Sequence, residues 1–171
     1  QNIISEKTSL VSIMFGNNEV GTIQPIAKIA KICHENKILF HTDAVQAVGK
    51  LPVDVKELGV DLLSISSHKL HGPKGIGALY IKDGVKIDPI ILGGGQEFRL
   101  RSGTENVASI VGFGQACEIA QNNLIENSSL IKKLQTLLVK RVLDEIPEVT
   151  FNGHSEYRLS NKRIRNNAHR K

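Results

Sequence analysis

The stretch SISSHKLHGPKGIGALYI, from Ser64 to Ile81, decides how the rest of the chain is interpreted. It starts as a run typical of a β-strand, passes through a His-Lys pair, and continues with a proline and three glycines into another such run. Glycine lets a backbone turn tightly and approach a bound group closely. Lys69 is therefore either a solvated surface amine or an amine held in place for chemistry.

Segments typical of strands and helices alternate around this stretch. Strands are expected at 10–15, 38–44, 61–67 and 77–81, and helices at 25–37 and, with a break near 126–129, at 106–146. Two further runs, 86–95 and 149–153, are also expected to be strands. This alternation predicts an α/β architecture with a mostly parallel sheet.

Polar residues lie at or just beyond the carboxyl end of each of the first three expected strands. They are Asn17 and Asn18 for the first, Asp43 and Gln46 for the second, and Ser66, His68 and Lys69 for the third. The carboxyl ends of parallel strands share one edge of the sheet, and ligands gather at that edge. We therefore expect these side chains to converge on one site.

The composition is that of an ordinary globular protein, with 40% hydrophobic and 23% charged residues in a chain of 171. No run approaches the roughly 20 apolar residues that a membrane helix needs, so a membrane protein is not expected. The net charge of +5 equals the charge of the five basic residues within 161–171. Residues 1–160 are neutral overall, which argues against nucleic acid as a partner of the domain.

The cysteines and histidines do not indicate a metal site. Cys33 and Cys117 are far apart and lie in apolar helical patterns, so both are expected to be buried thiols in a reducing, cytoplasmic setting. His68 and His71 have no further ligands at useful spacing.

A lysine and an aspartate at neighbouring strand ends suit pyridoxal phosphate. This cofactor needs an amine for its aldehyde and a carboxylate that faces its pyridine nitrogen. Amide groups can hold its ring hydroxyl oxygen, and small hydroxyls, histidine and backbone N–H groups can hold its phosphate. The nucleotide alternatives fail, because GPKGIGA lacks the spacing of a phosphate loop and of a dinucleotide fingerprint.

Four ordered motifs resemble those of cysteine desulfurases, which belong to the class V aminotransferase group. They are NNEVGTIQPI, FHTDAVQAVGK, SSHKLHGPKGIGALYI and GGGQEFRLRSGTEN, and the resemblance extends over residues 9–160. It implies the large domain of the fold type I transferases that depend on pyridoxal phosphate, a three-layer α/β/α domain with a mostly parallel sheet, followed by the start of a small C-terminal domain.

The resemblance also implies roles for single residues. Lys69 would be the catalytic lysine that forms a Schiff base with the cofactor. Asp43 would pair with the pyridine nitrogen, and Gln46 with the ring hydroxyl. Asn18 would lie beside the cofactor and the substrate carboxylate.

Three further residues would contact the phosphate of the cofactor by the same resemblance. Ser66 and His68 would bind it within one subunit, and Thr104 would reach the phosphate of the neighbouring subunit in a homodimer. Taken singly, several of the site residues also have structural explanations. Asp43 can cap a helix, His68 can be a structural histidine, and Thr104 can precede the next helix.

The reaction that the resemblance implies is the conversion of L-cysteine to L-alanine. The sulfur passes to an enzyme cysteine as a persulfide, and then to an acceptor or scaffold protein for iron–sulfur clusters or tRNA thiolation. Another class V enzyme remains an alternative, either a selenocysteine lyase or an aminotransferase. A non-catalytic remnant with a basic binding tail is the third.

The sequence departs from the family in three ways. Family members are more than twice as long, and neither Cys33 nor Cys117 lies in the Ser/Gly-rich loop that carries the persulfide cysteine. The arginine that binds the substrate carboxylate has no counterpart. We therefore expect an incomplete large domain at 1–125, the start of a small domain at 126–160 and an aberrant basic tail at 161–171, with no turnover by the chain alone.

Overall fold

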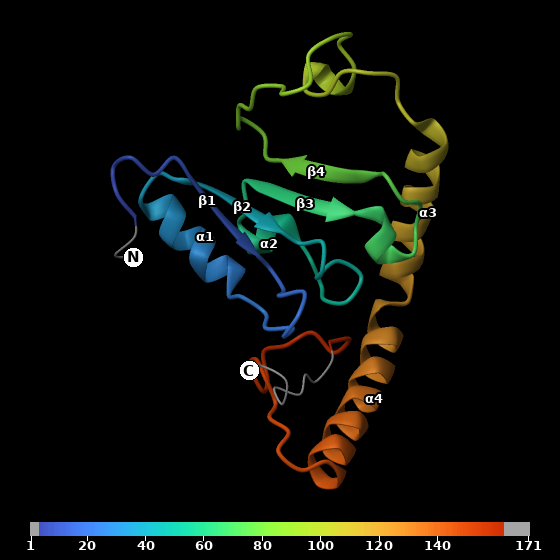
Figure 1. The fold of residues 1–171 in the computed structure, drawn as a ribbon. Coiled ribbons are helices and arrows are strands. Elements are labelled where there is room, and N and C mark those ends of the chain that lie inside the picture. The colour runs from blue at the N-terminus through green and yellow to red at the C-terminus, as the bar shows by residue number, and fades with distance from the viewer. Residues whose placement is uncertain (1–3, 163–171) are drawn as a thin grey trace.

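The computed structural model describes residues 4–162 and contains one sheet with helices packed on one of its faces (Figure 1). The α-helices and strands, in order, are β1 (Leu10–Met14), α1 (Ile26–Glu35), β2 (Leu39–Asp43), α2 (Val55–Leu58), β3 (Leu62–Ser66), β4 (Gly77–Ile81), α3 (Val107–Asn122) and α4 (Leu124–Glu145). Two 3-10 helices, η1 (Ser67–Leu70) and η2 (Glu97–Arg99), follow β3 and β4. Four of the predicted strands are confirmed.

The sheet is mixed and mostly parallel, as predicted. Its strands lie in the order β1-β2-β3-β4, with β1, β2 and β3 parallel and β4 antiparallel to β3. Met14 is opposite Asp43, which in turn is opposite Ser64. The antiparallel direction of β4 follows from its short connection, because a parallel neighbour needs a crossover of about a dozen residues or more.

One face of the sheet carries the main core. Alternate residues of β2, Phe40 and Thr42, are fully buried, because successive side chains of a strand point to opposite faces. Phe40 packs with Ile26 and Ala30 of α1, and partly buried residues of α2 join the same cluster. A smaller cluster around Phe113 attaches α3 beside it.

The opposite face of the sheet is open to solvent. Leu10, Met14 and Leu39 point to this side and stay between 37% and 47% exposed. Within residues 4–162, the expected three-layer domain is therefore represented by the sheet and one layer of helices.

Three local predictions are wrong. Residues 86–95 form no strand, because Pro89 and three consecutive glycines at 93–95 oppose a regular ladder. Residues 149–153 are also irregular, and the nearby pairing is a single bridge between Thr22 and Arg158. The break between the last two helices lies at Asn123 rather than at 126–129, where α4 continues.

The break coincides with a side-chain contact at the end of α3. Asn123 donates from Nδ2 to the carbonyl of Ile119 at 3.0 Å, and its own backbone leaves the helical region at φ −100° and ψ 6°. Ser128, within the polar stretch, donates to the carbonyl of Lys50 at 3.0 Å and is accommodated in α4.

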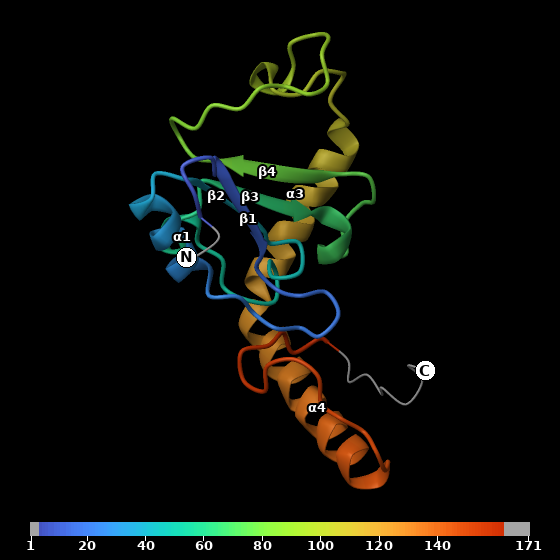
Figure 2. The ribbon, with the colours of Figure 1, turned by 60° about the vertical axis from the view of Figure 1, so that its left-hand side comes forward.

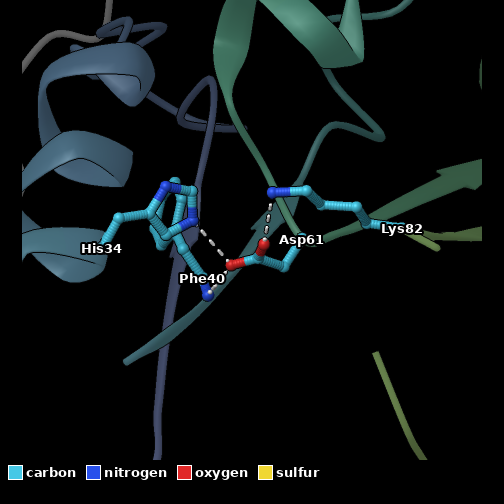
Figure 3. A network of polar contacts seen from close by, with 4 residues as sticks. All are labelled: His34, Phe40, Asp61 and Lys82. Carbon is cyan, nitrogen blue, oxygen red and sulfur yellow. Dashed lines mark hydrogen bonds and ion pairs between the residues drawn. The ribbon is translucent and has the colours of Figure 1, made fainter. Parts of the chain in front are cut away.

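A buried carboxylate ties the elements together at the amino edge of β3 (Figure 3). Asp61 is 4% exposed and accepts from the backbone N–H of Phe40 at 2.9 Å. His34 Nε2 lies 2.9 Å from it, and Lys82 Nζ 3.2 Å. Burial by itself raises the pKa of Asp61, but these three contacts together lower the pKa below its usual value.

The segment after α4 returns to the loop that follows β1 (Figures 1 and 2). Ile23 donates its N–H to the carbonyl of Tyr157 at 2.9 Å, and Leu159 donates to the carbonyl of Gly21 at 2.8 Å. In the part of the chain that the structure describes, no helix is both long and apolar enough to cross a bilayer. Most of the predicted basic tail, residues 163–171, lies outside the described residues.

Candidate active site

The carboxyl edge of the parallel strands gathers most of the predicted site residues. Asp43 ends β2, Ser66 ends β3, and Asn18 lies in the loop after β1. Lys69 lies in η1, directly after β3. The pairing of Met14, Asp43 and Ser64 across three strands places these ends beside one another.

Lys69 is presented to solvent because its neighbours anchor the short helix that carries it. Ser67 and Leu70, one turn of a 3-10 helix apart, are buried, so the residues between them face outward. The N–H of Ser67 donates to the carbonyl of Ile76 at 3.1 Å, and the N–H of Gly72 donates to the carbonyl of Ser67, also at 3.1 Å. These two hydrogen bonds hold the glycine-rich turn at 71–76 against the short helix that carries Lys69.

Gly72 is required for this turn by lack of space. A Cβ atom at this position would lie 2.3 Å from Ser67 Oγ and 2.9 Å from Ala116 Cβ. The close approach of the turn to α3 explains one of the three glycines that follow Lys69.

Ser66 and His68 form a polar pair beside Lys69. Ser66 Oγ lies 2.8 Å from His68 Nδ1, within hydrogen-bond distance. Because Nδ1 faces Ser66, Nε2 is the ring nitrogen left to bind another group, and His68 is exposed. A hydroxyl and an imidazole in this arrangement can bind an oxyanion.

Asp43 begins the turn that carries Gln46. One carboxylate oxygen of Asp43, Oδ1, accepts from the N–H of Val45 at 2.9 Å, which fixes the side chain at the strand end. The residue is exposed, so its second oxygen can meet a ligand at the edge of the sheet. Gln46 is half-buried in the same turn.

His41 is a site neighbour that the sequence reasoning missed. Its Nδ1 lies 2.7 Å from Ser12 Oγ and its Nε2 lies 2.8 Å from Ser64 Oγ, so the ring bridges β1 and β3. Burial lowers the pKa of His41, and the charge of Asp43 partly opposes this. The signal was available, because His41 precedes Asp43 by two residues in a strand and must share its face.

Two further lysines surround Gln46. Lys162 Nζ donates to the side-chain Oε1 of Gln46 at 2.6 Å, and Lys50 Nζ donates to its carbonyl at 3.1 Å. Burial, followed by the charges of Lys162 and Lys69, lowers the pKa of Lys50 to about 8. Burial and the charge of Lys69 also lower the pKa of Lys162.

Lys50 and Lys162 both contact Gln46, and the charge of Lys69 lowers the pKa of each, so the three amines form one electropositive region at the site. Lys50 is the last residue of the motif FHTDAVQAVGK, so the sequence could have predicted that it lies near the site. Lys162 is separated from Gln46 by 116 positions, and no local pattern connects the two.

The structure does not bring Thr104 to the other candidates. It is exposed in the loop between η2 and α3, and Figure 1 shows that loop beyond β4, on the side away from β2. A role for Thr104 within its own subunit has no support from this placement.

The two cysteines lack the properties of a reactive thiolate. Cys33 is 1% exposed in the core, where burial and the charge of Asp61 raise the pKa of its thiol. Cys117 is half-buried rather than buried as predicted, because α3 contacts the rest of the chain along only part of its surface. Burial raises the pKa of its thiol as well.

The model of the family described as aminotransferase class-V matches residues 1–167, so this chain belongs to that family. A cysteine desulfurase IscS of Methanosarcina thermophila is 54% identical over 161 residues, which are 94% of this chain and 40% of that protein. A probable mitochondrial cysteine desulfurase of Dictyostelium discoideum is 51% identical over 155 residues, 90% of this chain and 34% of its own length.

Solved structures confirm the fold class. One described as a NifS-like protein superposes with a TM-score of 0.87 at 47% identity, over 94% of this chain and 44% of that one. DndA of Streptomyces lividans superposes with a TM-score of 0.83 at 33% identity, over 93% of this chain and 46% of its own. The chain thus spans less than half the length of the relatives that it matches.

Proposed function

We propose that this chain carries the cofactor lysine of a cysteine desulfurase that depends on pyridoxal phosphate and converts L-cysteine to L-alanine. The observation that carries the proposal is the placement of Lys69, an exposed amine at the same sheet edge as Asp43. The similarity to proteins named cysteine desulfurase, at 50–54% identity over most of the chain, supports this reaction over others.

The donor set fits the chemical groups of the cofactor. Lys69 supplies an amine for the aldehyde, Asp43 an anion for the pyridine nitrogen, and Gln46 an amide for the ring hydroxyl. The Ser66–His68 pair supplies two polar groups for the phosphate, at 2.8 Å from each other. The positive charges of Lys50, Lys69 and Lys162 favour a ligand that carries negative charge.

Each of these residues has a definite task in the proposed reaction. When bound, pyridoxal phosphate supplies an electron-accepting ring that stabilises negative charge at the substrate Cα. Asp43 holds the proton on the ring nitrogen, and Lys69 moves the proton at the substrate Cα as a general base. Asn18, in the loop after β1, orients the substrate carboxylate in this proposal.

The sulfur carrier and the partners also belong to this proposal. The sequence has only two cysteines, and the raised pKa of both thiols opposes a role for either as persulfide carrier. Turnover then needs a cysteine from outside these 171 residues. We place the protein in the cytoplasm, with a second subunit that receives Thr104 and an acceptor or iron–sulfur scaffold protein that receives the sulfur.

The proposal is tested by locating the lysine that reacts with the cofactor. The chain is incubated with pyridoxal phosphate, reduced with borohydride and mapped by peptide mass spectrometry. The label is expected on Lys69 and should be lost in Lys69→Ala, whereas Lys74→Ala should keep it. A label on Lys74, or equal labelling of Lys69→Ala, contradicts the assignment.

A further inference from the structure

The orientation of the Gln46 carboxamide is set by a lysine from the far end of the described chain. Lys162 Nζ donates to Gln46 Oε1 at 2.6 Å. An ammonium group can only donate, so the carboxamide must present its oxygen to Lys162. Its NH2 group is then directed away from Lys162 and remains the donor for another partner.

The position of Lys162 is built by two other elements. Its carbonyl accepts from Gln135 Nε2 of α4 at 3.2 Å, and Gln135 is 8% exposed. Its stem lies against Gly21, where an added Cβ would be 2.9 Å from Lys162 Cβ and Cγ. The lysine is half-buried between α4 and the β1 loop, which directs its amine toward Gln46.

The charge of Lys162 has no acidic partner within residues 4–162. The ion pairs found there involve Lys31, His34, Lys82 and Arg141, all away from Gln46. Its hydrogen-bond partner is a neutral amide oxygen, so its positive charge stays available to an anionic or hydroxyl oxygen nearby.

We propose that Lys162 is a positioning residue, which orients the Gln46 carboxamide so that its NH2 group donates to the ring hydroxyl oxygen of pyridoxal phosphate. This inference rests on the proposed function, in which Gln46 contacts that oxygen. Lys162 acts through Gln46 and adds positive charge beside the same oxygen. No sequence motif contains both residues, and the contact exists only because the chain returns after α4.

Lys162→Met tests the role, because it keeps the stem and the backbone contact to Gln135 and removes only the amine. Binding of pyridoxal phosphate that depends on Lys69 should weaken about tenfold, since a hydrogen bond to a charged group contributes roughly that factor or more. Lys162→Arg should restore most of the affinity. Lys140→Met, on the exposed side of α4, should bind like the wild type.

Two spectroscopic readings separate positioning from a structural role. In the ligand-free chain, the side-chain amide resonance of Gln46 should move in Lys162→Met and stay unchanged in Lys140→Met, with equal Tm for all three proteins. In the bound chain, the cofactor absorption maximum should shift in Lys162→Met and return in Lys162→Arg, because the charge beside the ring hydroxyl changes.

Unaltered or tighter binding by Lys162→Met overturns the inference, and so does an unchanged Gln46 resonance. A failure of the proposed function gives a different result. Binding of pyridoxal phosphate would then be the same in the wild type and in Lys69→Ala. The positioning role would be refuted as well, even if the Gln46 resonance still moved in Lys162→Met.

Discussion

At the scale of single residues, the site places an exposed lysine among other amines. Lys69, Lys50 and Lys162 lie close enough for the charge of Lys69 to lower the pKa of the other two. Gln46 contacts two of these amines, through its side chain and through its carbonyl. The region is therefore electropositive before any ligand binds, which favours a phosphate-bearing ligand over a neutral one.

Lys50 should make the free energy of unfolding increase with pH in the alkaline range. Its folded pKa of about 8 lies below the ordinary value near 10.4, so the unfolded state binds more protons between these values. The free energy of unfolding should therefore gain a contribution from Lys50 as pH rises through this window. Lys50→Met should lack that contribution in urea titrations at pH 7 and pH 10.5. Parallel pH profiles for the two proteins would contradict the prediction.

Asp61 also contributes stability that increases with pH, but it does so in the acid range. Its folded pKa is lowered, so its contribution is present above the unfolded value of about 3.9 and is lost as pH falls through the folded value. Asp61→Asn should cost about 1–3 kcal/mol at pH 7, because it removes the buried anion that accepts from the N–H of Phe40 and pairs with the partly exposed His34 and Lys82. Urea titrations should show this difference shrinking below about pH 4. Asp83→Asn, an exposed neighbour, is the control, and an equal loss there would refute the explanation.

At the scale of elements, η1 and the turn after it determine how the lysine is presented. Ser67 and Leu70 anchor the short helix in the core, while His68 and Lys69 face outward. The turn behind them approaches α3 so closely that a side chain at Gly72 would collide with Ser67 and Ala116. Packing of α3 against η1 therefore holds in place the short helix that carries Lys69.

Gly72→Ala tests this dependence. The added methyl group should destabilise the chain by about 1–3 kcal/mol, because it overpacks the contact with Ser67 and Ala116. It should also reduce covalent labelling of Lys69 by pyridoxal phosphate. Gly114→Ala lies in α3 with nothing within 4 Å of the added atom and should be neutral or stabilising. Equal stability of the two variants in denaturant would disprove the packing argument.

At the scale of the whole molecule, the sequence predicted the sheet but not the return of the chain after α4. The four strands have clear apolar patterns, and the structure confirms each of them. The extra strands at 86–95 and 149–153 do not form: Pro89 and the glycines at 93–95 oppose a ladder in the first, and the pairing near the second is the single bridge between Thr22 and Arg158. The pairing of Gly21 with Leu159 depends on tertiary contacts that no local pattern encodes.

The same distinction holds for the site. Asp43, Ser66 and Lys69 follow strands directly, so strand order alone predicts that they share an edge. Lys162 reaches Gln46 only through the fold, and Thr104 stays away from both in this chain. The sequence therefore predicts the site residues that lie at strand ends. It does not predict residues such as Lys162, which reach the site only through tertiary contacts.

The chain by itself should not turn over L-cysteine. Cys33 lies in the core, and the pKa of both thiols is raised, so neither is suited to accept sulfur. Assays of the purified chain for alanine and sulfide should stay at background with pyridoxal phosphate present. Turnover that disappears in Cys117→Ser would show that the assignment of this thiol is wrong.

A crystal structure of the chain with pyridoxal phosphate tests the assignment of Lys69 most directly. We predict electron density continuous with Lys69 Nζ, a ring nitrogen facing Asp43 and a phosphate beside Ser66 and His68. Density on another lysine, or a ring bound away from the carboxyl edge of β2 and β3, would contradict it.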